Sequence, residues 1–369
     1  MKAPDPLYYS DYLELDTLLS CQRPRSAARG KSAHDEMLFI IVHQTYELWF
    51  KQILFEMDSV MALFAKEPVD ESDMGVAVSR LERIVEIQKI LVDQISVLET
   101  MTPLDFLEFR DLLYPASGFQ SWQFRLVENL MGLAPAQRHL FAGGAYHAAL
   151  EPAHRRLVEE SEARPSLLAL VERWLERTPF LDTSAFKFLE AYRGAVERML
   201  EADREVVRTN PRLSEEERVR ELAEFGATEE SFRALFDESR HRALVETGER
   251  RLSYRATLAA LFIHLYRDQP ILHLPYRFLT ALVEMDGWFT AWRNRHALMV
   301  MKMLGTKIGT GGSSGYGYLK VTAEKHKVFR DLANLSTFLI PRSALPALPD
   351  DVRRSLGFSY ESGAGGSGR

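Results

Sequence analysis

The chain has 369 residues, 46% of them hydrophobic and 27% charged, a balance typical of a globular protein of one large domain or two ordinary ones. Its net charge of −6 argues against nucleic acid or an anionic membrane as the main partner, and the sequence has neither a signal segment nor a run of about 18 apolar residues. Cys21 is the only cysteine, which excludes an intrachain disulfide and a thiolate metal cluster, so we expect a cytoplasmic protein.

Apolar residues recur three and four positions apart along almost the whole chain, most clearly in residues 81–92 and 167–175. This spacing is that of amphipathic helices, and strand-like alternation is scarce. Prolines, among them Pro103, Pro115 and Pro275, divide the pattern into helices of ordinary length. The sequence therefore predicts an all-α fold.

The segment LFIIVHQTYELWFKQILFEMDSV, residues 38–60, places His43 directly after five apolar residues. A histidine in such a segment is most often a core residue whose ring is bonded to a backbone carbonyl. The functional alternative is an imidazole that contacts a ligand in a site kept dry by the apolar residues. The segment alone leaves both interpretations open.

In LDFLEFRDLLYPASGFQSWQFR, residues 104–125, Arg110 follows Phe106 by four positions. We therefore expect Arg110 on the apolar face of a helix that Pro115 ends. A guanidinium in that position needs an anion, and its planar fork matches a carboxylate at two points. The carboxylate could belong to the protein, either Glu108 or a distant glutamate, or to a ligand.

Between residues 202 and 251 the composition shifts to dense mixed charge, as in LSEEERVRELAEF. Such charge suits solvated helices, so we expect a smaller peripheral helical insert there. The C-terminal segment ESGAGGSGR is expected to be disordered.

One face of the helix predicted within residues 285–305 combines aromatic, histidine and methionine side chains at spacings of three or four. These residues are Trp288, Trp292, His296, Met299 and Met303. Plain core is the common meaning of such a face, but it also suits a haem, whose iron takes one imidazole and whose macrocycle needs apolar walls. Zinc is disfavoured, because neither His296 nor His43 has a second His or Cys at i+3 or i+4.

The next segment, GTKIGTGGSSGYGYL at residues 305–319, begins with Gly305, a natural stop for the preceding helix. Its GTGGSSG stretch lacks the ending of a Walker loop and follows a helix instead of a strand, so it is no nucleotide-binding fingerprint. It offers backbone N–H groups and hydroxyls, among them that of Thr310, on a chain flexible enough to close over a ligand. A linker is the alternative interpretation.

Four long segments together resemble the signature blocks of the tryptophan 2,3-dioxygenase family. They are HDEMLFIIVHQTYELWFKQILFEMDSV, ETMTPLDFLEFRDLLYPASGFQSWQFR, WRNRHALMVMKMLGTKIGTGGSSGYGYL and KVFRDLANLSTFLIPR. The N-terminal YYSDYLELDTLLSCQ also matches, and the blocks keep the family's order. The resemblance implies a haem b enzyme, with one haem per subunit and iron that cycles through the ferrous state. Its reaction would add O2 across the indole C2–C3 bond of L-tryptophan and give N-formyl-L-kynurenine, the first step of tryptophan catabolism in the kynurenine pathway.

The resemblance also implies roles for individual residues. His296 matches the family's iron ligand, His43 the histidine that faces the substrate indole, and Arg110 the arginine that binds the substrate carboxylate. Further positions expected at the substrate are Phe39, Ile40, Ile41, Val42, Phe106, Thr310, Tyr12 and Leu13, and those expected at the haem are Ser117, Arg125 and Tyr9.

In the assembly that the resemblance implies, a homotetramer built as a dimer of dimers, residues 1–35 form an arm that reaches a neighbouring subunit's site. We expect the helical haem domain over residues 36–345, with the charged insert inside it, and a partly disordered tail over residues 346–369.

Two other functions stay open. A related haem enzyme could oxygenate a different indole, such as a methylated tryptophan, because Arg110 and Thr310 select a free amino acid without rejecting a ring methyl. The second alternative is a helical haem-binding or scaffold protein that catalyses no reaction. The presence of His43 and Arg110 at the family's positions argues against it.

Overall fold

The computed structural model describes residues 6–138, 145–183, 186–305, 307 and 315–358. These residues are helical almost throughout, and their only β-pairing is an isolated bridge between Asp182 and Lys187. The predicted all-α fold is confirmed. Within the described part of the chain, no helix combines the length and the apolar character needed to cross a membrane.

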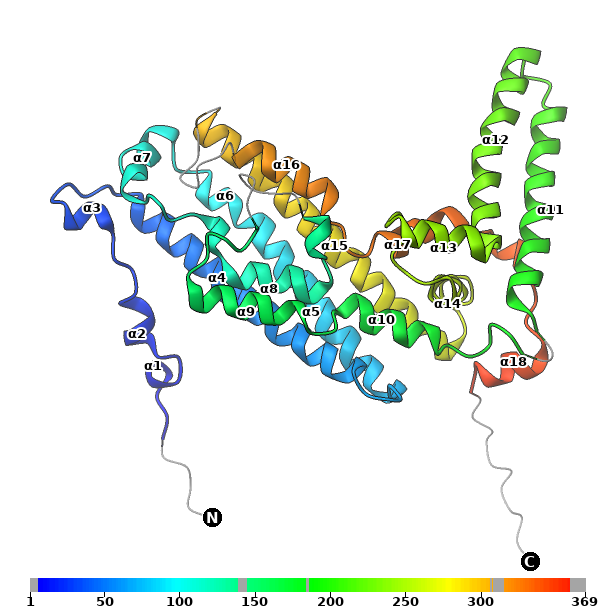
Figure 1. Cartoon of the computed structure of the whole chain (residues 1–369), viewed down its shortest axis with the longest axis horizontal. Helices are drawn as coiled ribbons and strands as arrows, with labels where there is room; N and C mark the ends of the chain where they lie inside the picture. Colours follow the sequence, from blue (N-terminus) through cyan, green and yellow to red (C-terminus); the bar gives the residue numbers. More distant parts are fainter. Residues whose placement is uncertain (1–5, 139–144, 184–185, 306, 308–314, 359–369) are drawn as a thin grey trace, which may run out of the picture. The chain divides into compact units, whose positions relative to one another are not determined.

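The chain divides into two compact units. The first comprises residues 1–58, 83–165 and 285–327, and the second comprises residues 59–82, 166–284 and 328–369. Three long helices contribute residues to both: α4 (Glu36–Phe64), α5 (Met74–Asp93) and α15 (Pro270–Leu304) (Figure 1).

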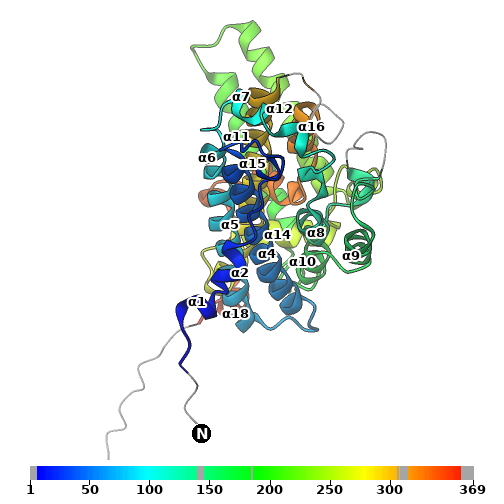
Figure 2. The same cartoon turned by 90° about the vertical axis from the view of Figure 1, so that its left-hand side faces the viewer.

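The first unit holds the shorter helices of the N-terminal and central chain. They are α1 (Tyr9–Tyr12), α2 (Leu15–Leu19), α3 (Arg25–Ala28), α6 (Ile95–Leu98), α7 (Pro103–Leu107), α8 (Trp122–Met131), α9 (Pro152–Glu162) and α16 (Gly315–Lys325). α8 packs against α9, and the two run side by side in Figure 1 and Figure 2.

The first part of the N-terminal arm, which holds α1 and α2, stands apart from the other helices of the first unit (Figure 1), and neither helix buries any of its residues. It is anchored only beyond α2, where the Glu36 carboxylate at the start of α4 accepts hydrogen bonds from the backbone N–H groups of Arg25 (2.7 Å) and Ser26 (2.9 Å). The apolar side chains of the arm therefore have no partner within the described residues of this chain that would bury them.

The second unit is built from the helices that follow residue 166. They are α10 (Leu167–Glu176), α11 (Phe188–Thr209), α12 (Glu215–Phe236), α13 (Glu238–Glu246), α14 (Tyr254–Leu265), α17 (Arg330–Ala333) and α18 (Asp350–Ser355). α10 packs on α14, and α11 pairs with α12 (Figure 1). The charged segment 202–251 thus supplies the end of α11 and all of α12 and α13, and Arg204 forms an ion pair with Glu229 between α11 and α12.

Proline and glycine mark the helix ends mostly as the sequence predicts. Pro103 and Pro152 occupy first-turn positions of α7 and α9, where the missing N–H needs no partner, and Gly305 follows the end of α15 with a left-handed φ of +57°. The break expected at Pro275 is wrong, because Pro275 lies inside α15. It stands only five residues after the start at Pro270, so it interrupts little of the helical hydrogen bonding.

Candidate active site

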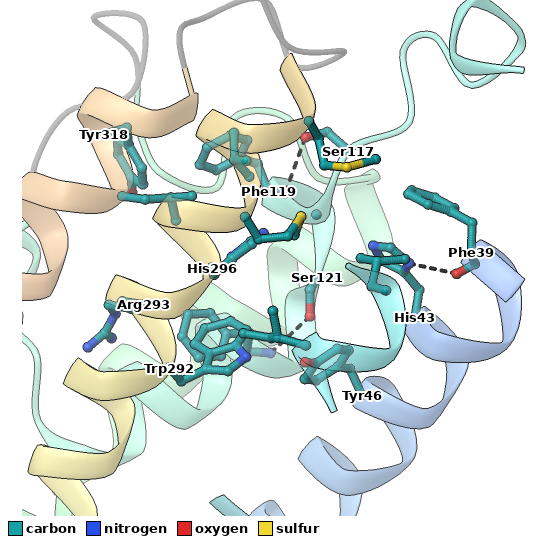
Figure 3. A pocket seen from close by; sticks show the side chains of 18 of the residues that line it. Phe39, His43, Tyr46, Ser117, Phe119, Ser121, Trp292, Arg293, His296 and Tyr318 are labelled. Carbon is teal, nitrogen blue, oxygen red and sulfur yellow. Dashed lines mark hydrogen bonds between the residues drawn. The ribbon is translucent and has the colours of Figure 1, made fainter. Parts of the chain in front are cut away.

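A mostly apolar cavity of about 260 Å³ lies in the first unit, lined by residues of α4, α15, α16 and the chain from α6 to α8 (Figure 3). Polar side chains interrupt its wall at few places. His43 and His296 are two of them, Arg110 is a third, and Arg125 with Arg293 marks a fourth. The combination of apolar walls with a few convergent polar groups is typical of a ligand site.

His296 projects into this cavity from α15, with Trp292 beside it (Figure 3). Met299, three residues further along α15, also lines the wall. Its Nδ1 is buried and has no hydrogen-bond partner among the described residues. Burial, with a smaller contribution from His43, lowers the pKa of His296 to about 4. The ring is therefore neutral at pH 7, which is the form of histidine that binds a metal.

These surroundings fit a haem. A haem brings four nitrogens of its own and takes one imidazole from the protein, and its macrocycle needs apolar and polarisable walls. Within the described part of the chain, no three His, Cys, Asp or Glu side chains are grouped to hold a metal ion. Trp288 does not line the cavity, although it shares the spacing of Trp292 and His296, and the Lys89 ammonium lies 5.8 Å from its ring centroid.

His43 faces the same cavity from α4, and its ring is also bonded to a backbone carbonyl. Its Nδ1 lies 2.7 Å from the backbone carbonyl of Phe39, shown as a dashed line in Figure 3, and the rest of the ring is exposed toward the cavity. Because a carbonyl only accepts, Nδ1 carries the proton and Nε2 keeps its lone pair. Dense surrounding protein lowers the pKa of His43, which the Phe39 carbonyl and Glu47 offset in part.

Arg110 lines the cavity with Phe106, but not on the single helix that the sequence predicts. α7 ends at Leu107, and Arg110 begins a separate 3₁₀ segment, Arg110–Leu112. The backbone leaves helical geometry at Phe109 (φ −125°), whose fully buried ring packs against Phe106 at 5.5 Å between centroids. Packing of this ring stabilises the break, so the expectation of one helix that Pro115 ends is wrong.

Ser117 and Arg125 also line the cavity. Ser117 caps the 3₁₀ segment Gly118–Gln120, where its hydroxyl accepts from the N–H of Phe119 (3.4 Å). Arg125 lies on α8 and is almost completely buried.

A buried ionic cluster surrounds Glu128, one turn after Arg125 on α8. The Glu128 carboxylate accepts hydrogen bonds from Arg125 Nη1 (2.8 Å), Arg138 Nη1 (2.6 Å) and Arg293 Nη2 (3.0 Å), and His326 Nδ1 lies 3.2 Å away. Burial alone would raise the pKa of Glu128, but the arginines hold it well below its usual range. The carboxylate is therefore ionised.

This cluster was missed in the sequence, although one signal was present. In SWQFRLVENLM, Arg125 and Glu128 are the two charged residues of the segment and lie three apart, a spacing that brings the two side chains together. Arg293 gave no signal of its own, because it lies among other charged residues in WRNRH.

Some residues expected at the site do not line the cavity of this chain. Ile40, Ile41 and Val42 belong to α4 but are not part of the wall. Tyr9, Tyr12 and Leu13 lie in and just after α1 on the exposed arm, with 75%, 72% and 39% of their surfaces exposed. Thr310 lies outside the described residues.

Comparison with known proteins gives a consistent result. The family described as tryptophan 2,3-dioxygenase matches residues 2–339. A tryptophan 2,3-dioxygenase of Bdellovibrio bacteriovorus is 53% identical over 98% of this chain and 100% of its own length. Proteins of the same name from Dictyostelium discoideum and Mus musculus are 48% and 46% identical, over 96% and 95% of this chain and 89% and 86% of their own lengths.

Proposed function

Because the chain belongs to the tryptophan 2,3-dioxygenase family, we propose that it is a haem-dependent dioxygenase of L-tryptophan. The reaction adds both atoms of O2 across the indole C2–C3 bond and gives N-formyl-L-kynurenine, the first step of tryptophan catabolism. The observation that supports this function most directly is one apolar cavity shared by His43, Arg110 and His296, which come from three separate segments.

The cofactor in this proposal is haem b, one per subunit, with His296 as the protein ligand of its iron. Bound haem supplies the activation of O2, for which the iron must be ferrous. The chain contributes a neutral imidazole and an apolar wall that excludes water, with Trp292 and Met299 next to the ligand. Ser117 and Arg125 would contact the cofactor's periphery.

His43 orients the indole ring. Its Nδ1–H donates to the Phe39 carbonyl, so the Nε2 lone pair is available to accept a hydrogen bond from the indole N–H. With a pKa below its ordinary value, His43 is far too weak a base to remove that proton outright. Phe39 and Phe106, whose rings stack on each other at 5.7 Å between centroids, would form one wall beside the flat substrate.

Arg110 binds the carboxylate of the amino acid, which its planar guanidinium can hold at two points. Thr310 would contact the ammonium and carboxylate ends, as the resemblance implies. Ile40, Ile41 and Val42 continue the apolar segment before His43, and of these Val42 is buried and would help to exclude water, whereas Ile41 is 47% exposed.

The enzyme in this proposal is a homotetramer, a dimer of dimers, whose arms exchange between subunits. The support is the exposure of Tyr9, Tyr12 and Leu13, which an isolated chain would leave in water. Tyr9 would lie near a neighbour's haem, and Tyr12 and Leu13 near its substrate.

The test is an absorption spectrum of the purified protein under air, before and after addition of L-tryptophan. We expect a haem Soret band and the growth of N-formylkynurenine absorbance with consumption of O2. A haem spectrum that tryptophan leaves unchanged, with no product, would mean a haem-binding protein without this activity. The absence of bound haem would contradict the proposal altogether.

A further inference from the structure

The ionic cluster around Glu128 contains more positive than negative charge. Three guanidiniums, those of Arg125, Arg138 and Arg293, share one carboxylate, and the exposed fractions of these arginines are 5%, 7% and 4%. Among the described residues, the cluster therefore has two positive charges in excess. Buried charge without a counterion is costly, so a surplus of this size indicates that an anion belongs there.

No neighbouring side chain among the described residues of the wall supplies that anion. Burial raises the pKa of Tyr318, so its phenol stays protonated. Burial lowers the pKa of His326, which keeps its ring neutral. The other carboxylate on the wall, Glu47, lies one turn after His43 on α4 and accepts a hydrogen bond from Gln123 Nε2 (2.9 Å).

The surplus charge faces the cavity. Arg125 and Arg293 line it, whereas Arg138 lies behind them and contacts Asn129 as well as Glu128. Arg125 Nε is buried and has no hydrogen-bond partner within the described part of the chain. In Figure 3, Arg293 lies on the side of His296 away from His43.

α15 presents this charge in a fixed relation to the expected iron ligand. Arg293 precedes His296 by three residues, so the two side chains lie on neighbouring turns of one helix face. A ligand held at His296 can therefore reach Arg293 with a substituent at its edge.

We propose that Arg125 and Arg293 bind the two propionate carboxylates of the haem, and that Glu128 positions their guanidiniums. The inference rests on the proposed function, because it takes haem as the ligand of the cavity. It gives the arginines of the site separate tasks: Arg110 serves the substrate carboxylate, and Arg125 with Arg293 serves the cofactor. Two propionates would balance the two surplus charges and fix which edge of the macrocycle faces α8.

The test compares haem with haem dimethyl ester, which keeps the iron and the macrocycle but has no carboxylates. Wild-type protein and the Arg125→Gln variant are loaded with each, and the rate of transfer to excess apomyoglobin is followed by the Soret band. Because Arg125→Gln loses charge-assisted hydrogen bonds to a propionate, we expect it to release haem about tenfold faster than the wild-type protein, or faster still. The diester has no such bonds to lose, so the variant should release it at the wild-type rate. Arg156→Gln is the matched control, since Arg156 lies on α9 of the same unit with its side chain 78% exposed, and it should change neither rate.

Two results would overturn the proposal. If Arg125→Gln speeds the release of haem and of the diester equally, Arg125 supports the fold and does not bind the propionates. If the wild-type protein releases haem and the diester at the same rate, the surplus charge serves a free anion and not the propionates. A wild-type protein that holds neither porphyrin would instead contradict the proposed function itself. If circular dichroism shows that Arg125→Gln does not fold, Arg125→Lys replaces it, and a smaller acceleration confined to haem is then expected.

Discussion

His296 is the expected iron ligand and lies in a mostly apolar wall, so the outcome of removing its ring can be predicted. His296→Gly should delete the iron ligand and leave a slot of imidazole size in an apolar wall. We expect the purified variant to contain little haem, and free imidazole to restore a Soret band by filling the slot. Absorbance per chain, with and without imidazole, measures both effects.

The matched control is His264→Gly. His264 is also a helical histidine whose pKa burial lowers, but its Nδ1 bonds to the Ala260 carbonyl (2.7 Å) in the second unit. The His264→Gly variant should therefore have the same haem content as the wild-type protein. A His296→Gly protein with full haem and normal turnover would show that the iron is held elsewhere.

The lowered pKa of His43 predicts how substrate binding depends on pH. Neutral His43 accepts from the indole N–H, and burial keeps the ring neutral below the ordinary histidine pKa of about 6.5. The KM for tryptophan should therefore stay constant down to about pH 6.5 and rise only below it. Glu47 raises the pKa of His43, so Glu47→Gln should move this rise to lower pH. A wild-type KM that already increases above pH 7 would contradict the assignment.

Arg110 predicts a difference between substrates with and without a carboxylate. Arg110→Leu should weaken L-tryptophan binding by about 2–5 kcal/mol, the usual cost of removing one partner of a buried charge pair. The same variant should lose much less binding free energy for tryptamine, because tryptamine has no carboxylate for Arg110 to bind. Arg110→Lys keeps the charge without the planar fork and should still be impaired on tryptophan. Steady-state kinetics on both compounds decide, and equal losses on both would make Arg110 structural.

At the scale of single elements, α7 has only five residues, yet it positions Phe106 and precedes Arg110. A capping box holds it, in which Thr102 accepts from the Asp105 N–H (3.3 Å) and the Asp105 carboxylate accepts from the Thr102 N–H (2.9 Å). Thr102→Ala should cost about 1 kcal/mol of stability and raise the KM for tryptophan, with haem content unchanged.

The control for this cap is Ser166→Ala, which removes the N-cap of α10 in the second unit. Denaturant titration should show a similar loss of stability in the two variants, while only Thr102→Ala changes KM. If KM responds equally to both, the effect is general destabilisation and not the position of α7.

Most elements were predictable where one local rule acts alone, although Pro275 did not end its helix. Spacings of three and four predicted the all-α fold, and Gly305 marked the end of α15 because a left-handed residue there favours glycine. The break after α7 escaped prediction, because the apolar spacing continues through Phe109 into the next segment. What interrupts the helix is the packing of Phe109 against Phe39 of α4 and Phe106 of α7 itself.

At the scale of the whole molecule, the site is formed by residues that are far apart in the sequence and meet only in the folded chain. Arg125 and Arg293 meet on Glu128 although they belong to different helices, α8 and α15, and Arg293 is ordinary in its own segment. A charged residue in a sequence resembles solvated surface until its partners are known. The cavity-lining roles of His43 and His296 could be anticipated from the resemblance, whereas the ionic cluster required the folded chain.

The arm carries the remaining prediction, which concerns more than one subunit. Tyr9 and Tyr12 are mostly exposed, and none of the described residues 6–16 lines the cavity. Deletion of residues 1–16 should therefore leave haem binding intact, because His296 and the wall are untouched. If the arm completes a neighbour's site, the same deletion should raise the KM for tryptophan, which steady-state kinetics measure.

Complementation separates a shared site from simple loss of stability. A subunit without its arm keeps Arg110, and an Arg110→Leu subunit keeps its arm. In a mixed assembly, some sites therefore combine the intact Arg110 of one subunit with the arm of the other. At a tryptophan concentration where each variant alone has little activity, mixing the two under conditions of subunit exchange should therefore restore part of the activity. The control is a mixture of Arg110→Leu with a His296→Gly protein that lacks its arm, and this mixture should not recover activity. An unchanged KM in the deletion protein would count against an exchanged arm, and so would a mixture that stays inactive although mass spectrometry shows that the subunits have exchanged.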